Sequence, residues 1–325
     1  MVSFNVTISA KRRTYLLKNM NILFAKFHGL GNDWLVVGGE DLPRSLAKFA
    51  RAILDRHTGV GADGLLVMMP PRYKKHAARL RFFNADGSEA EMSGNGIRCA
   101  GAFLAELSPG RRKFLIETPA GLKALEKVKE EKGKWLFRVG MGAPVLEPAK
   151  IPFKGGAVKA PVKGYALPTA SGALPVTVTS MGNPHCSIFV DQFDQFDAGP
   201  GFIAAPANTE DSASLERETV HGWEGVGRVV ERSPFFPNRT NVEFVKVISR
   251  REIEVRFWER GVGHTMSSGT GSCAAAVASI LNGFTDRQVR VRTEAGDLQV
   301  DWPENGEVVL TGPVERVANG AYVFR

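Results

Sequence analysis

Two short loops of this chain carry residue types that could bind and activate a small anionic molecule. One is Ser93-Gly94-Asn95-Gly96 and the other is Ser268-Gly269-Thr270-Gly271. Each places a hydroxyl residue directly before an Ala-rich apolar run that is typical of a helix. The start of a helix has unpaired N–H groups and a partial positive charge, which bind a carboxylate or a phosphate. Glycine lets such a ligand approach the backbone closely.

The two loops belong to a longer internal repeat. They lie 175 positions apart. Neighbouring segments match at the same offset: Arg81-Phe82-Phe83 with Arg256-Phe257-Trp258, and Thr118-Pro119-Ala120-Gly121 with Thr293-Glu294-Ala295-Gly296. Three matches at one spacing indicate two related halves whose loops could hold one small anion from both sides. The spacing fits neither the Walker phosphate loop nor the dinucleotide fingerprint. We therefore expect a small carboxylate ligand and no nucleotide.

Composition and charge indicate an ordinary soluble protein. The 325 residues are 43% hydrophobic and 23% charged, with a net charge of +8. The excess charge is concentrated near the N-terminus, where the basic residues that precede the first acidic one are Lys11, Arg12, Arg13, Lys18 and Lys26. No basic helix with interleaved aromatic residues follows, so the sequence gives weak support for nucleic-acid binding.

Targeting signals and metal-binding patterns are not found in the sequence. No apolar run approaches the roughly 18 residues that span a bilayer, and no signal-peptide pattern is present. The three cysteines, Cys99, Cys186 and Cys273, form no cluster with metal-ligand spacing. We therefore expect a cytoplasmic protein with no metal, no membrane partner and no nucleic-acid partner.

The predicted elements are mostly strands, with few long helices. Helices are expected over residues 43–54, 98–107 and 273–281, the last one closed by Asn282-Gly283. Strands are expected over residues 22–27, 34–37, 64–69, 80–83, 114–117, 136–139, 241–247, 252–258, 289–293 and 298–302. Residues 197–236 are rich in Gly, Pro, Ser and Glu and are expected to form an irregular excursion outside the core.

These elements predict an α+β protein with two pseudo-symmetric domains. Each domain is expected to wrap a sheet around a central apolar helix, with the active site in the cleft between the domains. The expected N-terminal domain is residues 20–140, after an extension at 1–19. The expected C-terminal domain is residues 141–312, and residues 313–325 form a strand that can return to the N-terminal domain.

From about residue 20 to its end, the chain resembles the diaminopimelate epimerase family. The matching blocks occur in the family's order and are Phe27–Asp33, Asp55–Gly64, Phe83–Cys99, Met181–His185 and Glu259–Gly263. This family is cofactor-independent and interconverts the LL and meso forms of diaminopimelate, feeding lysine and cell-wall synthesis. The resemblance implies an isomerase of this type, a substrate with two carboxylates, no cofactor and a homodimer.

The resemblance also implies a role for each matching polar position. Five side chains match family positions that bind the polar ends of the amino acid: Asn32, Asn84, Asn183, Asn241 and Arg260. Two pairs match the backbone clamps on the α-carboxylate: Gly94 with Asn95, and Gly269 with Thr270. His185 and Glu259 match the acid/base supports beside the reacting carbon.

The chain departs from the family at the two catalytic bases. The family uses two cysteines, one on each face of the α-carbon, and this chain has Ser93 and Ser268 there. A thiol has a pKa near 8.5, whereas that of an alcohol is close to water's value of about 15.7. Forming the base from serine therefore costs ~10 kcal/mol more. A second departure is His264, where the family usually has glutamate.

Three functions remain compatible with this sequence. The primary expectation is amino-acid epimerisation, with Ser93 and Ser268 on the two faces of the α-carbon, activated by His185, Glu259 or His264. The second is another α-proton reaction, by an amino-acid racemase or a dehydratase, for which a single base suffices. The related proline-racemase group is similar in including dehydratases with altered cysteine positions. The third is a non-catalytic amino-acid-binding protein.

Overall fold

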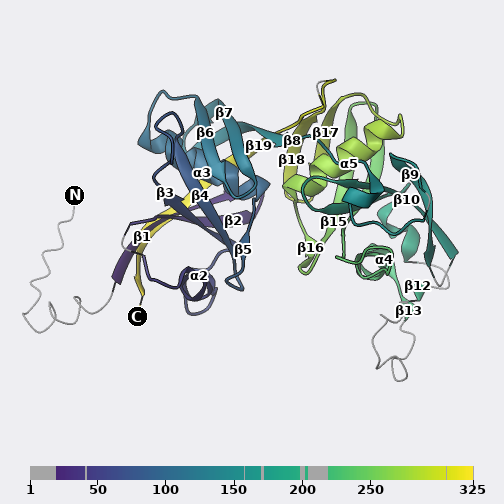
Figure 1. The fold of residues 1–325 in the computed structure, drawn as a ribbon, viewed down its shortest axis with the longest axis horizontal. Coiled ribbons are helices and arrows are strands. Elements are labelled where there is room, and N and C mark those ends of the chain that lie inside the picture. The colour runs from purple at the N-terminus through teal and green to yellow at the C-terminus, as the bar shows by residue number, and fades with distance from the viewer. Residues whose placement is uncertain are drawn as a thin grey trace, which may run out of the picture. The chain divides into compact units, whose positions relative to one another are not determined.

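The chain divides into two compact units in the computed structural model (Figure 1). The N-terminal unit comprises Met1–Ala124, Glu130–Trp135 and Val314–Arg325, and the C-terminal unit comprises Leu125–Lys129 and Leu136–Pro313. The described residues are 20–40, 42–156, 158–169, 172–197, 202–203, 219–304 and 306–324. The expected extension at residues 1–19 lies outside them.

The N-terminal unit is built on a mixed sheet. Its strands are β1 (Met20–Gly29), β2 (Asn32–Gly38), β3 (Gly64–Met69), β4 (Ala78–Asn84), β5 (Glu89–Ala90), β6 (Lys113–Thr118) and β7 (Gly121–Glu131). The end of β19 (Val308–Phe324) pairs antiparallel with β1, so that Phe324 lies opposite Met20. β1 is antiparallel to β2, β2 is parallel to β3, β3 is antiparallel to β4, and β4 is parallel to β6.

Two helices of this unit contact the sheet, α2 (Leu46–Leu54) and α3 (Gly94–Leu107). Side chains on β2 alternate between its two faces, as in any strand. Leu35 and Val37 share a core with Phe49 of α2. Trp34, on the other face, packs against Phe82 at 6.1 Å between ring centroids and lies close to α3. Burial on both faces explains why these strands read as continuous apolar runs.

The C-terminal unit repeats this plan around α5 (Gly269–Leu281). Its strands are β8 (Lys134–Gly142), β9 (Val162–Thr169), β10 (Gly172–Ser180), β11 (Pro184–Phe189), β14 (Asn241–Ser249), β15 (Glu252–Glu259), β16 (Gly263–Thr265), β17 (Gln288–Thr293) and β18 (Gly296–Asp301). Short elements are η1 (Pro148–Lys150), η2 (Phe193–Phe196), β12 (Phe202–Ile203) and β13 (Thr219–Val220). β11 is parallel to β14, β14 is antiparallel to β15, and β15 is parallel to β17. This is the order of pairings that β2, β3, β4 and β6 follow in the N-terminal unit.

Both central helices begin earlier than the apolar pattern predicts. α3 starts at Gly94 and α5 at Gly269, four residues before the predicted starts at residues 98 and 273. The first turns contain Gly, Asn and Thr, which are poor helix formers, so their composition hides the helix start. The two serines provide N-caps that compensate for this. None of the helices in the described part of the chain is long and apolar enough to cross a membrane.

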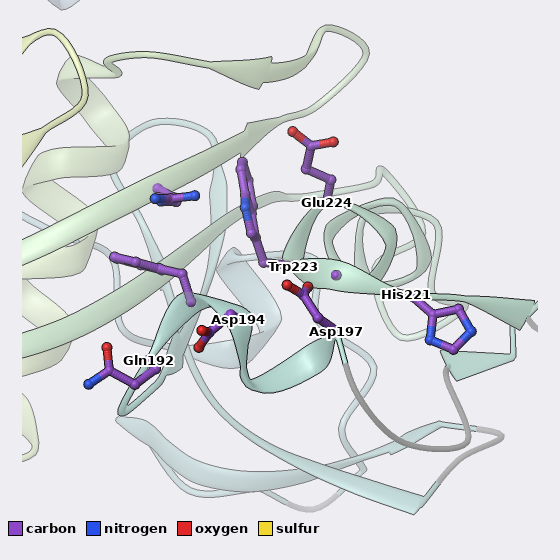
Figure 2. A pocket seen from close by; sticks show the side chains of 9 residues that line it. Gln192, Asp194, Asp197, His221, Trp223 and Glu224 are labelled. Atoms are coloured by element: carbon purple, nitrogen blue, oxygen red, sulfur yellow. The ribbon is translucent and has the colours of Figure 1, made fainter.

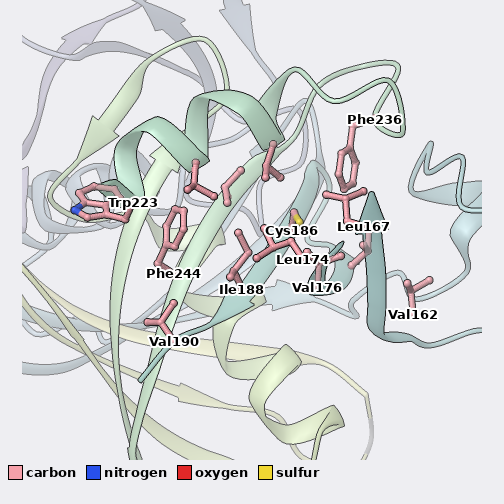
Figure 3. Packing of buried hydrophobic residues seen from close by; sticks show 14 of the residues in the cluster. Val162, Leu167, Leu174, Val176, Cys186, Ile188, Val190, Trp223, Phe236 and Phe244 are labelled. Atoms are coloured by element: carbon pink, nitrogen blue, oxygen red, sulfur yellow. The ribbon is translucent and has the colours of Figure 1, made fainter. Parts of the chain in front are cut away.

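The expectation of an irregular excursion at residues 197–236 is wrong for its second half. Residues Gly222–Glu231 form α4, which packs on the face of the sheet that carries Phe244 (Figure 3). Its buried residues Trp223, Val226 and Val230 recur at helical spacing, a period that outweighs the local content of Gly and Glu. Residues 198–201 and 204–218 of the same stretch lie outside the described ranges.

Removing the Phe49 side chain tests the packing of α2 and the chain's last strand. Phe49 is fully buried, and its ring lies 5.3 Å from that of Phe324 in β19. Phe49→Ala should lower the free energy of unfolding by about 3–5 kcal/mol, because it removes apolar contacts and leaves a cavity. Leu23→Ala, at a side chain that is 74% exposed, is the control and should change it by less than about 0.5 kcal/mol. Urea unfolding measures both variants, and an equal loss of unfolding free energy in the two would contradict this packing.

Candidate active site

Two serines cap the central helices with the same geometry. Ser93 has φ −132° and ψ 128°, and its Oγ accepts a hydrogen bond from Gly96 N at 3.1 Å. Ser268 has φ −130° and ψ 127°, and its Oγ accepts one from Gly271 N at 3.2 Å. The internal repeat therefore extends to the conformation of these two residues. Each serine oxygen lies at the positive end of a helix of 13 or 14 residues.

The last glycine of each loop is required by packing. A Cβ on Gly96 would lie 3.2 Å from the Trp34 ring, and one on Gly271 would lie 2.9 Å from the Phe257 ring. Each helix start is thus pressed against an aromatic side chain of the sheet that it crosses. The sequence predicts that these glycines let a ligand approach the backbone. The structure shows that they also let the helix start pack against an aromatic ring.

Glu259 is the carboxylate that contacts Ser268. It receives a hydrogen bond from Thr265 Oγ1 at 2.7 Å, and it also interacts with the Ser268 hydroxyl. Burial raises the pKa of Glu259, and these two polar neighbours oppose that shift only in part. Glu259 is thereby able to hold or release a proton closer to neutral pH than an exposed glutamate can.

His264, the other departure from the family, makes different contacts. Its Nε2 lies 2.6 Å from Glu294 Oε2 and its Nδ1 lies 3.2 Å from Glu224 Oε1. The ring packs edge-on against Trp223 at 4.9 Å between centroids. Among the three residues that could activate Ser268, Glu259 is the one whose pKa responds to the Ser268 hydroxyl.

His185 lies in the interior of the C-terminal unit. Its ring is fully buried, with Nδ1 at 2.6 Å from Glu243 Oε1 and Nε2 at 2.9 Å from Asn183 Oδ1. Ser187 Oγ donates to the other oxygen of Glu243 at 3.4 Å. The sequence reasoning missed Glu243. Its signal was a single carboxylate in the apolar strand Asn241–Ser249, on the same face as Asn241.

The Asn241 side chain forms hydrogen bonds with two other segments that carry candidate site residues. It lies opposite His185 in the parallel pairing of β11 and β14. Its Nδ2 donates to Pro184 O at 3.1 Å, and its Oδ1 accepts from Arg260 N at 2.9 Å. The structure therefore brings together Asn183, His185, Asn241, Glu259 and Arg260.

A buried glutamate that the sequence did not single out fixes the turn after Glu259. Glu231 of α4 accepts hydrogen bonds from Gly261 N and from Trp258 Nε1, both at 2.9 Å. Arg239 lies 3.5 Å from the same carboxylate. This anchors the turn that carries Arg260, whose side chain is exposed and donates to Asn238 O at 3.1 Å.

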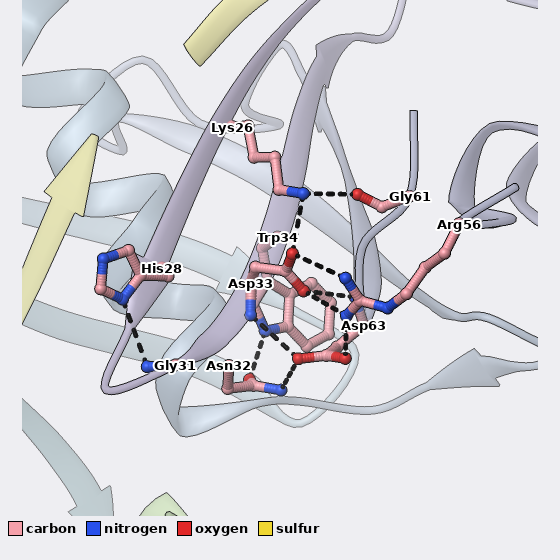
Figure 4. Close-up of polar contacts among 9 residues, drawn as sticks. All are labelled: Lys26, His28, Gly31, Asn32, Asp33, Trp34, Arg56, Gly61 and Asp63. Atoms are coloured by element: carbon pink, nitrogen blue, oxygen red, sulfur yellow. Dashed lines mark hydrogen bonds and ion pairs between the residues drawn. The ribbon is translucent and has the colours of Figure 1, made fainter. Parts of the chain in front are cut away.

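In the N-terminal unit, Asn32 and Asn84 lie at the same end of the sheet. Trp34 pairs with Gly64 and Gly64 with Asn84, which places the start of β2 beside the end of β4. Asn32 Nδ2 donates to Asp63 Oδ2 at 2.9 Å, and Asn32 Oδ1 accepts from Trp34 Nε1 at 2.6 Å. The Asn32 amide is therefore held in one orientation (Figure 4).

The side chain of Asn95 is buried and forms a hydrogen bond with Arg98. Its Oδ1 accepts from Arg98 Nη2 at 2.5 Å, and Arg98 Nη1 donates to Gly94 O at 2.9 Å. Arg98 is fully buried in α3. The Asn95 side chain therefore stabilises the helix start, and ligand binding by its backbone N–H stays a prediction.

The three cysteines are buried free thiols. Burial raises the pKa of Cys99 to about 12 and also raises that of Cys186. Neither is a thiolate at neutral pH, so these cysteines do not replace the missing bases. Among the described residues, no group of three or more His, Cys, Asp or Glu side chains could hold a metal ion.

A pocket of about 420 Å³ lies elsewhere in the C-terminal unit (Figure 2). Asp194, Asp197, Trp223 and Glu224 are among the residues that line it. None of the predicted site residues lines this pocket. The candidate site is therefore described by the hydrogen bonds among its residues, and this pocket is separate from it.

Comparison with known proteins gives the family. The profile of diaminopimelate epimerase matches residues 24–147 and 177–317. The chain belongs to the diaminopimelate epimerase family. It is 42% identical over 310 residues to the diaminopimelate epimerase of Pelotomaculum thermopropionicum, covering 93% of this chain and 99% of that one. It is 41% identical over 303 residues to that of Moorella thermoacetica, covering 92% and 98%.

Solved structures share the fold of this family member at low sequence identity. A probable proline racemase from Agrobacterium radiobacter K84 has a TM-score of 0.62 at 14% identity and covers 92% of each chain. A predicted epimerase from Pseudomonas aeruginosa has a TM-score of 0.60 at 16% identity, covering 92% of this chain and 98% of that one. These likenesses support the α+β fold.

Asp33, beside Asn32, provides a test of this polar network. Burial acts to raise the pKa of Asp33, but hydrogen bonds from Arg56 and Lys26 outweigh it and lower the pKa from 3.8 to about 2. Because the folded-state pKa is depressed, this stabilisation is present above pH 4 and is lost as pH falls toward 2. Arg56→Gln should lower the free energy of unfolding at pH 7 by about 1–2 kcal/mol and flatten its pH dependence between 4 and 2.

Arg81→Gln is the matched control for that variant. Arg81 forms an ion pair with Glu89 at 2.7 Å, and both side chains are 38% exposed, so its removal should change stability by less than about 1 kcal/mol. Urea unfolding at several pH values measures both variants. An unchanged slope between pH 4 and 2 in Arg56→Gln would contradict the role given to Arg56.

Proposed function

We propose that this chain is a cofactor-independent diaminopimelate epimerase that interconverts the LL and meso isomers by proton transfer at the α-carbon. The observation that carries the proposal is the pair of N-capping serines at the family's base positions, one of which interacts with the Glu259 carboxylate. Family membership and the relatives' names support the same reaction.

In this proposal, backbone N–H groups at the two helix starts bind the α-carboxylate. These are the N–H groups of Gly94 and Asn95 at the start of α3, and those of Gly269 and Thr270 at the start of α5. Negative charge that develops at the α-carbon spreads onto this carboxylate. The helix starts therefore stabilise the carbanion more than the substrate, as catalysis requires.

On the side of the C-terminal unit, the α-proton of the substrate is transferred to Ser268, and the Ser268 hydroxyl proton is transferred to Glu259. As the Cα–H bond breaks, its electron pair stays on carbon and its proton goes to Ser268 Oγ. The hydroxyl proton of Ser268 moves at the same time to the Glu259 carboxylate. This relay avoids a free alkoxide, which would cost ~10 kcal/mol more than a thiolate. The interaction of the Ser268 hydroxyl with Glu259 supports it.

Ser93 serves the opposite face of the α-carbon. Its hydroxyl donates a proton to the carbanion while it takes one from a water molecule, and this inverts the configuration. The hydroxide that is left takes the proton that Glu259 releases, so the enzyme returns to its starting state. The positive end of α3 stabilises the oxygen during this exchange. His185 supports Glu259 electrostatically, since its charge acts to lower the carboxyl pKa.

The remaining groups bind the polar ends of the substrate. The exposed Arg260 guanidinium suits a carboxylate, which it can bind through two parallel hydrogen bonds. The amides of Asn32, Asn84, Asn183 and Asn241 offer donors and acceptors to amino and carboxylate groups. We propose that the substrate has two carboxylates and that the enzyme acts in lysine biosynthesis. A cytoplasmic location fits three cysteines that are free thiols, and the homodimer stays a prediction.

One observation favours a second candidate, a different α-proton reaction on this fold. Both serine side chains accept an N-cap hydrogen bond, and Ser268 in addition interacts with the Glu259 carboxylate of its own unit. A single competent base would suffice for β-elimination. Release of ammonia or of a keto acid would identify that reaction.

Restoring the thiols tests the assignment of the two bases. The double variant Ser93→Cys, Ser268→Cys should raise the rate of LL to meso conversion by at least about 10-fold, because thiols ionise far more readily. Chiral chromatography of the product measures the rate. A folded double variant that binds diaminopimelate and stays inert would show that the serines do not face the α-carbon.

Replacing the carboxylate tests the relay. Glu259→Gln should lower kcat by about 100-fold or more, since a general base is lost. In the wild type, kcat/KM should fall as acid protonates Glu259, at a pH above its ordinary pKa of 4.5. Thr265→Val removes a hydrogen bond that lowers this pKa, so it should move the acidic limb to higher pH. An unmoved limb would contradict the assignment.

A further inference from the structure

A chain of three side chains runs from the interior of the C-terminal unit to a candidate substrate-binding amide. Glu243, 1% exposed, meets His185 Nδ1 at 2.6 Å. His185 Nε2 meets Asn183 Oδ1 at 2.9 Å. Asn183 itself is half-buried, and its Nδ2 has no hydrogen-bond partner among the residues that the structure describes.

The oxygen atoms beside the two ring nitrogens of His185 indicate which nitrogen carries a proton. An amide oxygen only accepts hydrogen bonds, so the Nε2 that faces it must carry a proton. At Nδ1, the ring either donates to an ionised Glu243 or accepts from a protonated one. With the Asn183 oxygen at Nε2, that nitrogen carries the donated proton in both arrangements.

We propose that Glu243 is a positioning residue that acts through His185 to hold the Asn183 amide with its oxygen inward and its amino group toward the substrate. The amino group then donates to a carboxylate of diaminopimelate. This inference rests on the proposed function for the identity of the ligand. The hydrogen bonds from Glu243 through His185 to Asn183 can be tested without any measurement of catalysis.

Two carboxyl groups interact electrostatically with His185. They are Glu243 on β14 and Glu259 on β15. The ring is fully buried, so solvent does not compete for Nε2.

Glu243→Gln tests this role by removing the carboxylate while keeping the size of the side chain. A neutral amide no longer fixes the proton, so a neutral ring can present a bare Nε2, and Asn183 can turn its oxygen toward the substrate. KM for diaminopimelate should rise by about 5-fold or more at pH 8 and return toward the wild-type value near pH 6, where an ordinary histidine is protonated. The value of kcat should fall by a smaller factor than KM rises, because His185 acts on Glu259 only electrostatically.

Glu117→Gln is the matched control. Glu117 makes the same contact with another buried histidine, at 2.7 Å from His76 Nδ1 in the N-terminal unit. This variant should leave KM and its pH dependence unchanged. For Glu243→Gln, a KM equal to that of the wild type, or one raised equally at every pH, would overturn the proposal. So would a loss confined to kcat.

A second variant tests which end of the substrate Asn183 meets. Asn183→Asp still accepts from His185 Nε2 but replaces the outward amino group with a carboxylate oxygen. Calorimetric binding of diaminopimelate should weaken by about 10-fold or more. Tighter binding would mean that position 183 faces an ammonium group, which overturns the proposal.

Nitrogen NMR of ¹⁵N-histidine-labelled wild-type protein separates this inference from the proposed function. The His185 Nε2 signal, assigned with a His185→Gln variant, should be that of a protonated nitrogen at pH 8 without substrate. A bare Nε2 overturns the inference whatever the enzyme turns over. A protonated Nε2, together with no conversion of diaminopimelate, leaves the hydrogen-bond chain standing and refutes the proposed reaction.

Discussion

The hydrogen bond from a helix N–H to a serine oxygen, made once in each unit, is the interaction on which the rest of the site depends. It starts α3 at Gly94 and α5 at Gly269, in sequences whose Gly, Asn and Thr would otherwise disfavour a helix. It also places a hydroxyl at each helix's positive end. Each helix start lies against an aromatic ring of the sheet, which leaves room only for glycine at the third position of the helix. The sheet therefore positions the ring, the ring positions the helix, and the helix positions the serine.

Buried carboxylates form the second layer of the site. Glu259 contacts Ser268, Glu243 contacts His185, and Glu231 holds the turn that carries Arg260. A buried carboxylate is costly unless its oxygens are satisfied. Glu243 and Glu231 each have at least two hydrogen-bond or ion-pair partners, and Glu259 accepts a hydrogen bond from Thr265. Replacing thiols with alcohols weakens the intrinsic acidity of the bases. A carboxylate beside the alcohol is the group that can accept the proton in their place.

Much of the fold could be predicted from the sequence, because strands and central helices leave a local apolar pattern. The strand at 64–69 was predicted with its observed bounds, and both serine loops were recognised from their repeat. The helix starts were missed by four residues because the cap that begins them is a single hydrogen bond. α4 was missed because its composition was weighed above its period. Glu243 could not be paired with His185 in advance, since 58 residues separate them and only the parallel pairing of β11 with β14 brings them together.

The measurement that tests the central claim most directly is proton NMR of the wild-type protein with LL-diaminopimelate in D2O. Two N-capping serines and Glu259 are predicted to exchange the α-proton, so its signal should disappear while the meso isomer accumulates. An unchanged α-proton signal, with saturable binding of diaminopimelate shown by calorimetry, would contradict the account. The site would then be a binder of amino acids whose bases were lost with the two thiols.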